Sequence, residues 1–296
     1  MIKVCCPLCR KKSFKILFDK EGFNIVQCLN CQLIFVNPRL KHSQTNANYS
    51  KEYYKRPSRK SRQTHQGYDD YNKRYLHGKE RMRSKLILDK ISFYKKPPGK
   101  LVDVGAATGF FLKDALVRGW QAEGVEISNW AVNYARHHLK LKMTLGELKT
   151  AKFDNSSFDV VTMNDFLEHV QDPLEELKEA KRVLKKEGIL YVETLNFDGF
   201  INTKLIGQKY HLIAPKFHLT YFGRHQLLQM LKKAGFRVCS VELTSSSVGD
   251  FEYEGLRMYL RYFQLIILSI LGLRKNKIWA FKDIIKIIAQ KQGKSV

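Results

Sequence analysis

Four cysteines near the start of the chain have the spacing of a metal site. Cys6 and Cys9 form one Cys-x2-Cys pair and Cys28 and Cys31 a second, with 18 residues between the pairs. Two such pairs can present four thiolates to one tetrahedral Zn²⁺, and a four-cysteine site leaves no position for a reactive water. The spacing therefore predicts a structural zinc site, with redox or disulfide use and coincidence as alternatives. Cys5 is a second candidate for the first ligand.

A second group of residues has the pattern of a nucleotide-type turn. An apolar run containing Asp103 leads into the small residues Gly105, Ala107 and Gly109. Small residues let the backbone approach a ligand closely and adopt positive φ. Glu126 follows 23 residues after Asp103, at the end of the next apolar run, where a carboxylate can accept both hydroxyls of a ribose. The alternative is that Glu126 is an acid at the start of the following helix.

These side chains must be positioned by an alternation of apolar strands and amphipathic helices that begins after the Pro-Pro-Gly at 97–99. Such alternation is typical of an α/β fold with a parallel sheet. Strands are predicted at 100–105, 120–126, 141–145, 158–163, 188–194, 236–243 and 282–290. Helices are predicted at 109–118, 128–138, 173–186 and 224–234. Asp172 and Pro173 predict the N-cap and first residue of the third helix, and Gly188 predicts its C-terminal glycine.

Three other segments surround or interrupt this pattern. Residues 1–38 combine short strand-like runs with the cysteine pairs, which predicts a small metal-binding module. Residues 39–98 are basic and rich in tyrosine, and we expect a helical lid or linker there. Within the domain at 99–296, the segment 256–279 is apolar on nearly every helical face. It predicts a helical insertion, either packed on the sheet edge or lying at a membrane surface.

Composition excludes several classes of protein. The chain has 296 residues, 44% of them hydrophobic and 27% charged, which argues against collagen-like, coiled-coil and wholly disordered chains. A net charge of +24 suggests an anionic partner such as nucleic acid, a phosphate ester or a lipid surface. The alternative is charge spread over solvated faces. The chain opens with no leader-like pattern, and its longest apolar run is too short to span a membrane, so we expect a cytoplasmic protein.

From residue 100 to about 245, together with the final strand, the sequence resembles the class I S-adenosylmethionine-dependent methyltransferases. The motifs that carry the resemblance are the turn at 103–109, the run DFLEHVQDP at 165–173, VLKKEGIL at 183–190 and HLTYF at 218–222. Ala107 stands where the family has a middle glycine. The cysteine pairs, the run FVNPR at 35–39 and a Tyr-Tyr segment are similar to a bacterial subgroup with a zinc ribbon before the catalytic domain.

The resemblance implies a Rossmann-like, seven-stranded, mostly parallel sheet with an antiparallel last strand, preceded by a small zinc-ribbon module. It also implies a binding site for S-adenosylmethionine, in which the turn cradles the methionine part and the residues after 145 surround the adenine. The implied cofactor-binding residues are Asp103, Gly105, Ala107, Gly109, Glu126, Glu147, Leu148 and Asn164.

Three residues are candidates for catalysis. Glu168, His169 and His218 fall where pocket residues of this fold should converge, and an imidazole can take a proton from a hydroxyl near neutral pH. Each could instead be a hydrogen-bonded structural residue. Asp165, Glu168 and His169 also resemble the metal-binding Glu-x-x-Glu-His of certain hydroxyl methyltransferases, which implies a second divalent ion there. Aspartate at the first position shortens its reach.

Three functions are compatible with these features. The leading hypothesis is methyl transfer to a small-molecule acceptor, anionic or lipid-linked, such as a sugar intermediate, with O-methylation preferred. The second is an RNA methyltransferase, which the zinc module and the positive charge favour. The third is a zinc-ribbon adaptor with a degenerate cofactor fold and no enzymatic activity.

Overall fold

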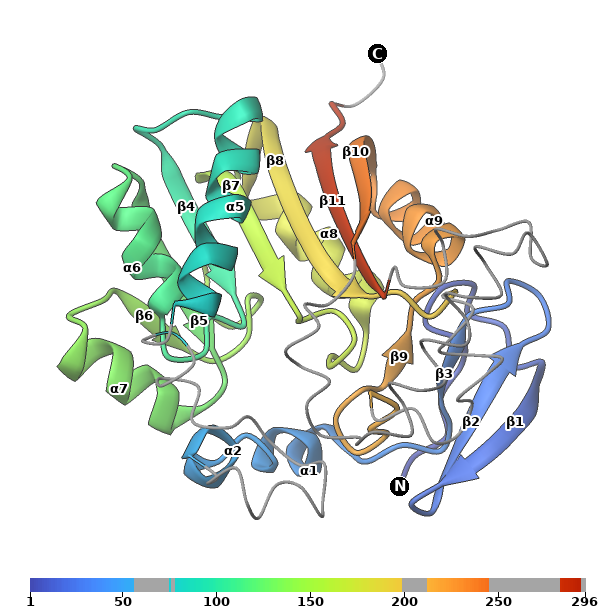
Figure 1. The fold of residues 1–296 in the computed structure, drawn as a ribbon. Coiled ribbons are helices and arrows are strands. Elements are labelled where there is room, and N and C mark those ends of the chain that lie inside the picture. The colour runs from blue at the N-terminus through green and yellow to red at the C-terminus, as the bar shows by residue number, and fades with distance from the viewer. Residues whose placement is uncertain (56–74, 76–77, 199–211, 245–282, 294–296) are drawn as a thin grey trace, which may run out of the picture.

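A seven-stranded sheet forms the centre of the computed structural model, which describes residues 1–55, 75, 78–198, 212–244 and 283–293 (Figure 1). Its strands, in spatial order, are β10 (Phe236–Thr244), β11 (Ile284–Lys291), β8 (Leu184–Leu195), β7 (Phe158–Asn164), β4 (Lys100–Val104), β5 (Gln121–Glu126) and β6 (Met143–Leu145). The pairs from β8 to β6 are parallel, whereas β11 runs antiparallel to both β8 and β10. The predicted fold class, including the antiparallel last strand, is confirmed.

Helices pack on both faces of this sheet because its strands alternate their side chains between two apolar cores. On one face lie α5 (Lys79–Tyr94), α6 (Phe110–Val117) and α7 (Asn129–His138), and on the other α8 (Pro173–Val183) and α9 (Arg224–Ala234). Along β8, Ile189 and Tyr191 join the first core, while Leu190 and Val192 join the second. This period of two is the expected pattern for a strand buried on both faces.

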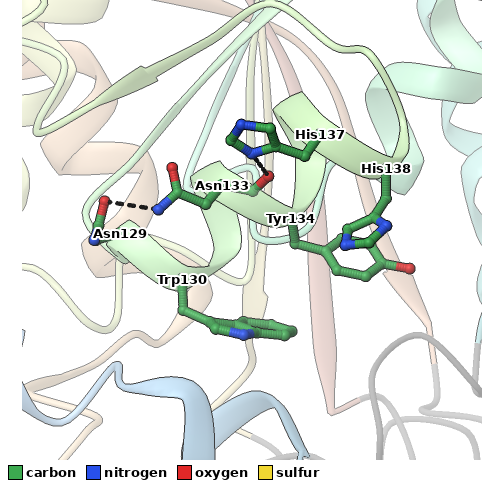
Figure 2. Close-up of a pocket in the computed structure, with 6 residues that line it drawn as sticks. All are labelled: Asn129, Trp130, Asn133, Tyr134, His137 and His138. Carbon is green, nitrogen blue, oxygen red and sulfur yellow. Dashed lines mark hydrogen bonds between the residues drawn. The ribbon is translucent and has the colours of Figure 1, made fainter.

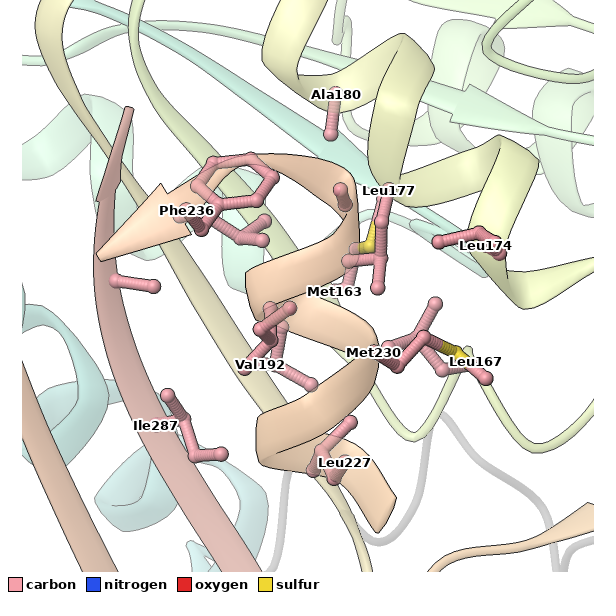
Figure 3. Close-up of a cluster of buried hydrophobic side chains, with 14 of the residues drawn as sticks. Met163, Leu167, Leu174, Leu177, Ala180, Val192, Leu227, Met230, Phe236 and Ile287 are labelled. Carbon is pink, nitrogen blue, oxygen red and sulfur yellow. The ribbon is translucent and has the colours of Figure 1, made fainter. Parts of the chain in front are cut away.

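The core between α8, α9 and the sheet shows how the amphipathic helices attach. Leu174 and Leu177 of α8 and Leu227 and Met230 of α9 lie three residues apart in their helices and turn toward the strands, where Val192 is among their neighbours (Figure 3). All five side chains are at most 5% exposed. Their burial supplies the main stabilisation of this face.

A second, four-stranded sheet contains the N-terminal residues. Its order is β1 (Phe14–Lys20), β2 (Phe23–Cys28), β3 (Ile34–Val36) and β9 (Thr220–Tyr221). In β9, Tyr221 pairs with Ile34 and Thr220 with Phe35. The core under α8 and α9 also continues into this region through Cys6, Leu8, Val26, Cys28, Leu33 and Phe35. The division at residues 38 and 98 stays a prediction, and residues 1–38 share a sheet and a core with the rest.

Two short helices, α1 (His42–Ala47) and α2 (Lys51–Lys55), follow the cysteine region. Figure 1 shows them beyond the end of the large sheet, with α2 near α7. The predicted insertion at 256–279, and residues 56–74 and 76–77 of the predicted lid, lie outside the described residues. Among the helices of the described ranges, none has the length and apolarity needed to cross a membrane.

The helix predicted at 173–186 is shorter than expected. Asp172 is its N-cap, accepting a hydrogen bond from Glu175 N, and Pro173 is its first residue, as predicted. The helix ends at Val183, however, and Gly188 lies inside β8 instead of closing the helix. Leu184 is fully buried and pairs with Phe158, and the register then shifts before the next pair. Sheet pairing of this buried leucine outweighs the helical pattern of the lysines that follow.

Candidate functional site

The turn after β4 has the backbone conformation that its small residues predict. Gly105, Ala107 and Gly109 have φ values of 76°, 49° and 84°. A Cβ at Gly105 would lie 2.7 Å from a ring carbon of Phe166, and one at Gly109 would lie 2.5 Å from a methyl carbon of Leu141. Glycine is therefore required at both positions by conformation and by space. At Ala107 the methyl group is accommodated in the left-handed region.

Asp103 and Asn164 lie together at the ends of adjacent strands. Asp103 Oδ1 accepts hydrogen bonds from Thr162 Oγ1 (2.5 Å) and Asn164 Nδ2 (3.2 Å). Burial raises the pKa of Asp103 to about 7, although these two donors oppose the rise. Asn164 Oδ1 is buried and has no hydrogen-bond partner among the described residues. This amide oxygen can accept a hydrogen bond from a ligand.

Glu126 ends β5 beside the turn. Its two carboxylate oxygens accept hydrogen bonds from Ala107 N and Ser128 N, each at 2.9 Å. Burial raises the pKa of Glu126, while these backbone donors and the Tyr54 hydroxyl lower it. Tyr54, in α2, stacks on Trp130 of α7 with ring centroids 5.5 Å apart. The side-chain cap of α7 is Ser128.

His169 and His218 lie side by side although 49 positions separate them in the sequence, and their ring centroids are 4.7 Å apart. His169 Nδ1 lies 2.9 Å from the Tyr49 hydroxyl and 3.2 Å from the Phe217 carbonyl oxygen. His218 Nδ1 lies 2.7 Å from the Leu212 carbonyl oxygen, so this nitrogen is the donor and Nε2 carries the lone pair of the neutral ring. Burial, and then the neighbouring His218, hold the pKa of His169 well below its ordinary value. Burial also lowers the pKa of His218.

Glu168 is a buried acid next to this pair in the sequence. Its side-chain atom Oε2 has no hydrogen-bond partner among the described residues, and its backbone oxygen accepts from Leu219 N (2.7 Å) and Thr220 N (3.2 Å). Burial and the nearby Asp165 raise the pKa of Glu168 to about 8. The carboxyl group is therefore mainly protonated at neutral pH.

The divalent-ion site predicted at Asp165, Glu168 and His169 is not formed. In the described part of the chain, the four cysteines are the one group of three or more His, Cys, Asp or Glu side chains whose ligand atoms lie within 4.8 Å of one another. The carboxylate of Asp165 instead accepts a 2.6 Å hydrogen bond from Arg83 Nη2. The partly exposed guanidinium of Arg83 therefore occupies the position at Asp165 that the pattern assigned to a metal ion.

Arg83 belongs to a partly buried charge cluster that sequence reasoning missed. Its Nε donates to Glu193 Oε1 at 3.1 Å, and the Tyr191 hydroxyl donates to Glu193 Oε2 at 2.6 Å. Attraction to Asp165 and Glu193 outweighs the effect of burial and raises the pKa of Arg83 well above its ordinary value. Glu193 is an acid within an apolar stretch of β8, and a charged residue in such a stretch was the sequence feature that could have indicated a buried partner.

Glu147 and Leu148 stand apart from the other predicted cofactor residues. The Glu147 carboxylate forms an ion pair with His42 of α1. Leu148 is fully buried and belongs to the apolar core under α8 and α9. The preceding residue, Gly146, donates its backbone N–H to Glu126 O at 2.9 Å. Contact of these two residues with an adenine stays a prediction.

An open hollow of about 510 Å³ lies along α7 (Figure 2). Its six lining residues are Asn129, Trp130, Asn133, Tyr134, His137 and His138. Trp130 stacks on Tyr134 with ring centroids 5.6 Å apart, and Tyr134 makes a tilted ring contact with His138 at 4.8 Å. Because none of the predicted site residues lines this hollow, we do not place the reaction there.

The four cysteine sulfurs are arranged as a compact group. Cys6 Sγ lies 3.4 Å from Cys31 Sγ, and Cys9 Sγ lies 3.4 Å from Cys28 Sγ. An ideal tetrahedron with metal–sulfur bonds of about 2.3 Å has sulfur–sulfur edges of about 3.8 Å, so these pairs are slightly closer together than in a metal-loaded site. Burial opposes ionisation of Cys28, but backbone hydrogen bonds outweigh it and lower the pKa to about 7. Cys5 lies outside the group.

Comparison with known families gives a match over more than half of the chain. Residues 75–241 match the model of a family described as "Methyltransferase domain". The matched range contains the turn after β4, Glu126, Asn164, Glu168, His169 and His218. The cysteine region lies outside it.

Curated relatives and solved structures are similar at low identity. An uncharacterized protein from Methanocaldococcus jannaschii is 27% identical over 48% of this chain, and a ubiquinone biosynthesis O-methyltransferase from Coxiella burnetii is 26% identical over 53%. Each match spans 66% of the relative's own length. The YcgJ protein of Bacillus subtilis has a TM-score of 0.53 at 15% identity, covering 72% of this chain and 99% of its own. A SAM-dependent methyltransferase from Methanosarcina mazei has a TM-score of 0.50 at 18% identity, covering 68% and 96%.

Proposed function

The chain belongs to the methyltransferase-domain family, and from this premise we propose that it is an S-adenosylmethionine-dependent enzyme that methylates a hydroxyl group of a small-molecule acceptor. The observation that carries the proposal is the pairing of the His169 and His218 imidazoles, whose ring centroids lie 4.7 Å apart. The name of the Coxiella burnetii relative, an O-methyltransferase, supports the choice of oxygen. A sugar or lipid-linked intermediate remains the acceptor class that we propose from the sequence.

The residues present fit the cofactor. Glu126 keeps lone pairs on both carboxylate oxygens for ribose hydroxyls, and the unpartnered Asn164 Oδ1 suits an ammonium or amide donor. Asp103, Glu126 and Asp165 gather negative charge at this edge of the sheet, which favours a cationic ligand. When bound, S-adenosylmethionine supplies a methyl group activated by a sulfonium. The protein must align the acceptor with that group and exclude water.

His218 is the base that we assign. Its Nδ1–H is committed to the Leu212 carbonyl, so Nε2 is the nitrogen that can take the hydroxyl proton as the acceptor oxygen gains its methyl group. The lowered pKa keeps this imidazole neutral at pH 7 and ready to accept. His169, tied to Tyr49, orients the pair. Glu168, carrying its own proton, can donate a hydrogen bond to the acceptor.

The test is methyl transfer by purified protein to hydroxyl acceptors, with nucleotide sugars and lipid-linked sugars as substrates and mass spectrometry of the products. His218→Asn retains an N–H donor near Nδ1 but has no counterpart of Nε2. We expect it to lower kcat by about 10²- to 10⁴-fold with the cofactor Kd unchanged. The matched control is His225→Asn, an exposed histidine of α9. Equal rates for wild type and His218→Asn would contradict the assignment, and methylated RNA as the sole product would contradict the acceptor class.

We also propose that Cys6, Cys9, Cys28 and Cys31 hold a structural zinc ion, because four sulfurs at these separations fit a tetrahedral cation. Metal analysis of purified protein should give about one equivalent of zinc, lost in Cys28→Ser and kept in the control Cys239→Ser. Less than half an equivalent in wild type, unchanged in Cys28→Ser, would refute the site.

A further inference from the structure

Arg39 is a buried arginine that the proposed reaction does not use. It ends the Phe-Val-Asn-Pro-Arg run after β3, and its side chain is 0% exposed. Nη1 donates to the Gln171 carbonyl oxygen at 3.0 Å, whereas Nε and Nη2 have no hydrogen-bond partner within the described ranges. Arginine is almost never fully buried unless it is paired. The guanidinium carbon also lies over the Phe35 ring, 6.0 Å from its centre, and negative charge nearby would offset the remaining cost of burying this cation.

Two sources of negative charge act on this guanidinium. Burial lowers the pKa of Arg39 to about 10, and attraction to Asp172 and then Cys6 limits the fall, so the group is charged at neutral pH. Both carboxylate oxygens of Asp172 already accept hydrogen bonds from Arg10, at 2.7 and 2.9 Å. Four thiolates around one Zn²⁺ carry two net negative charges. Arg10 N donates to the Cys6 carbonyl oxygen at 2.9 Å, so the ion pair of Arg10 with Asp172 places the cysteine group beside the residue that follows Gln171. A metal-loaded cysteine group would add its negative charge to that of Asp172, which is shared with Arg10.

The carbonyl that Arg39 binds belongs to the loop that follows the catalytic candidates. Gln171 is held a second time through its side chain, since Nε2 donates to the Leu40 carbonyl oxygen (3.2 Å) and to Thr45 Oγ1 (2.9 Å). Two residues earlier, His169 contacts Tyr49. The segment 39–49, which leaves the cysteine region, therefore contacts the loop at two successive places.

We propose that Arg39 is a positioning residue that joins the zinc centre to the loop 166–172. Its guanidinium is held in place by the charge of the metal-loaded thiolates and fixes the Gln171 carbonyl, and this in turn sets the position of Glu168 and His169. The inference rests on the proposed zinc site and gives that site a link to methyl transfer. Loss of zinc removes the counter-charge, so the loop loosens while the strands of the large sheet stay formed.

The experiment compares zinc-loaded and zinc-stripped full-length protein by amide hydrogen exchange with mass spectrometry, alongside zinc affinity from competition with a chelator. In wild type, stripping should raise exchange within 166–172 by about tenfold or more, ahead of exchange in β5. Arg39→Gln should show the raised exchange with zinc still bound, and further stripping should add little. Its zinc affinity should fall by about 10- to 100-fold.

Two other variants separate charge from geometry. Arg39→Lys keeps the charge but not the planar fork, so it should recover most of the zinc affinity and less of the loop protection. Arg118→Gln is the matched control, because Arg118 pairs with Asp89 on the surface and touches neither the cysteines nor the loop. It should behave as wild type in both measurements.

Wild-type zinc affinity in Arg39→Gln, or an equal rise in loop exchange on stripping wild type and Arg39→Gln, would overturn the proposal. If Arg39→Gln does not fold, its amides in β5 will lose their protection from exchange. The proposal is then tested by loop exchange and zinc affinity in wild type and Arg39→Lys. If zinc removal from wild type leaves amide exchange in the loop 166–172 unchanged, the result contradicts the coupling between the zinc centre and the loop, but not the zinc site itself. Absence of zinc from purified wild type contradicts the zinc site itself, a result that metal analysis gives independently of exchange.

Discussion

At the scale of single residues, Glu126 is the side chain on which cofactor binding should depend most. Glu126→Ala removes the carboxylate that we expect to accept the ribose hydroxyls, and it also leaves Ala107 N without its acceptor. We expect the Kd for S-adenosylmethionine to rise by about 100-fold, near 2.7 kcal/mol, in isothermal titration calorimetry. Glu123→Ala is the control on the same strand, since Glu123 pairs with Lys142. Unchanged binding in Glu126→Ala would contradict the cofactor site and revive the adaptor hypothesis.

Glu168 should make stability depend on pH. Its pKa rises from 4.5 to about 8 in the folded protein, so between these values the folded chain keeps a proton that the unfolded chain has released. Stability should therefore fall as pH increases through this window, by at most about 1.4 kcal/mol per pH unit. Glutamine at position 168 does not titrate, so the free energy of unfolding of Glu168→Gln should change less with pH than that of wild type.

Urea unfolding between about pH 5 and 8 measures this difference. Asp103, whose pKa is also raised, contributes equally to both proteins and cancels in the comparison. Parallel profiles for wild type and Glu168→Gln would show that the acid is already ionised in the folded protein.

At the scale of elements, the strands and helices of the sheet were predictable because each carries its own period of apolar residues. The end of α8 was not. Lys185 and Lys186 continue a helical pattern, yet Leu184 already pairs with Phe158 in the sheet. Local spacing contains no information about that partner, which lies in another strand. Sequence patterns therefore fail to predict helix ends that are determined by strand pairing, such as the end of α8.

The interface between α8 and α9 provides a test of packing. Leu177 is fully buried among the side chains drawn in Figure 3, so Leu177→Ala should lower the free energy of unfolding by about 2–5 kcal/mol. Val117→Ala, at an 82% exposed position that ends α6, should change it by less than about 0.5 kcal/mol. Urea denaturation measures both. Equal effects of the two variants would mean that α8 does not pack as described.

At the scale of the whole molecule, the cysteine region and the large sheet should unfold together. They share a core, and β9 completes the N-terminal sheet with residues from beyond position 218. Removing the proposed zinc ion with a chelator should therefore lower the midpoint of one cooperative thermal transition by about 10 °C, seen alike by near- and far-ultraviolet circular dichroism. Two separate transitions, only one of them sensitive to the chelator, would show that the regions are independent.

The charge surplus and the site have opposite signs. The chain carries a net charge of +24, yet acidic side chains gather where the strands of the large sheet end, with Arg83 as the basic partner of Asp165 and Glu193. The acids are Asp103, Glu126, Asp165 and Glu193. Such a site suits a cationic cofactor, so the positive charge must act elsewhere on the molecule.

The sequence by itself determined the cysteine spacing, the glycine turn, the acid that ends the second strand of the large sheet and the order of strands and helices, because each is a local pattern. Only the tertiary structure decided which distant groups meet. Tyr49 reaches His169 across 120 positions and Arg39 reaches Gln171 across 132. Asp165 pairs with Arg83 rather than with a metal ion. These contacts join residues that are far apart in the sequence and meet only in the folded chain, so the local spacing of residues does not predict them.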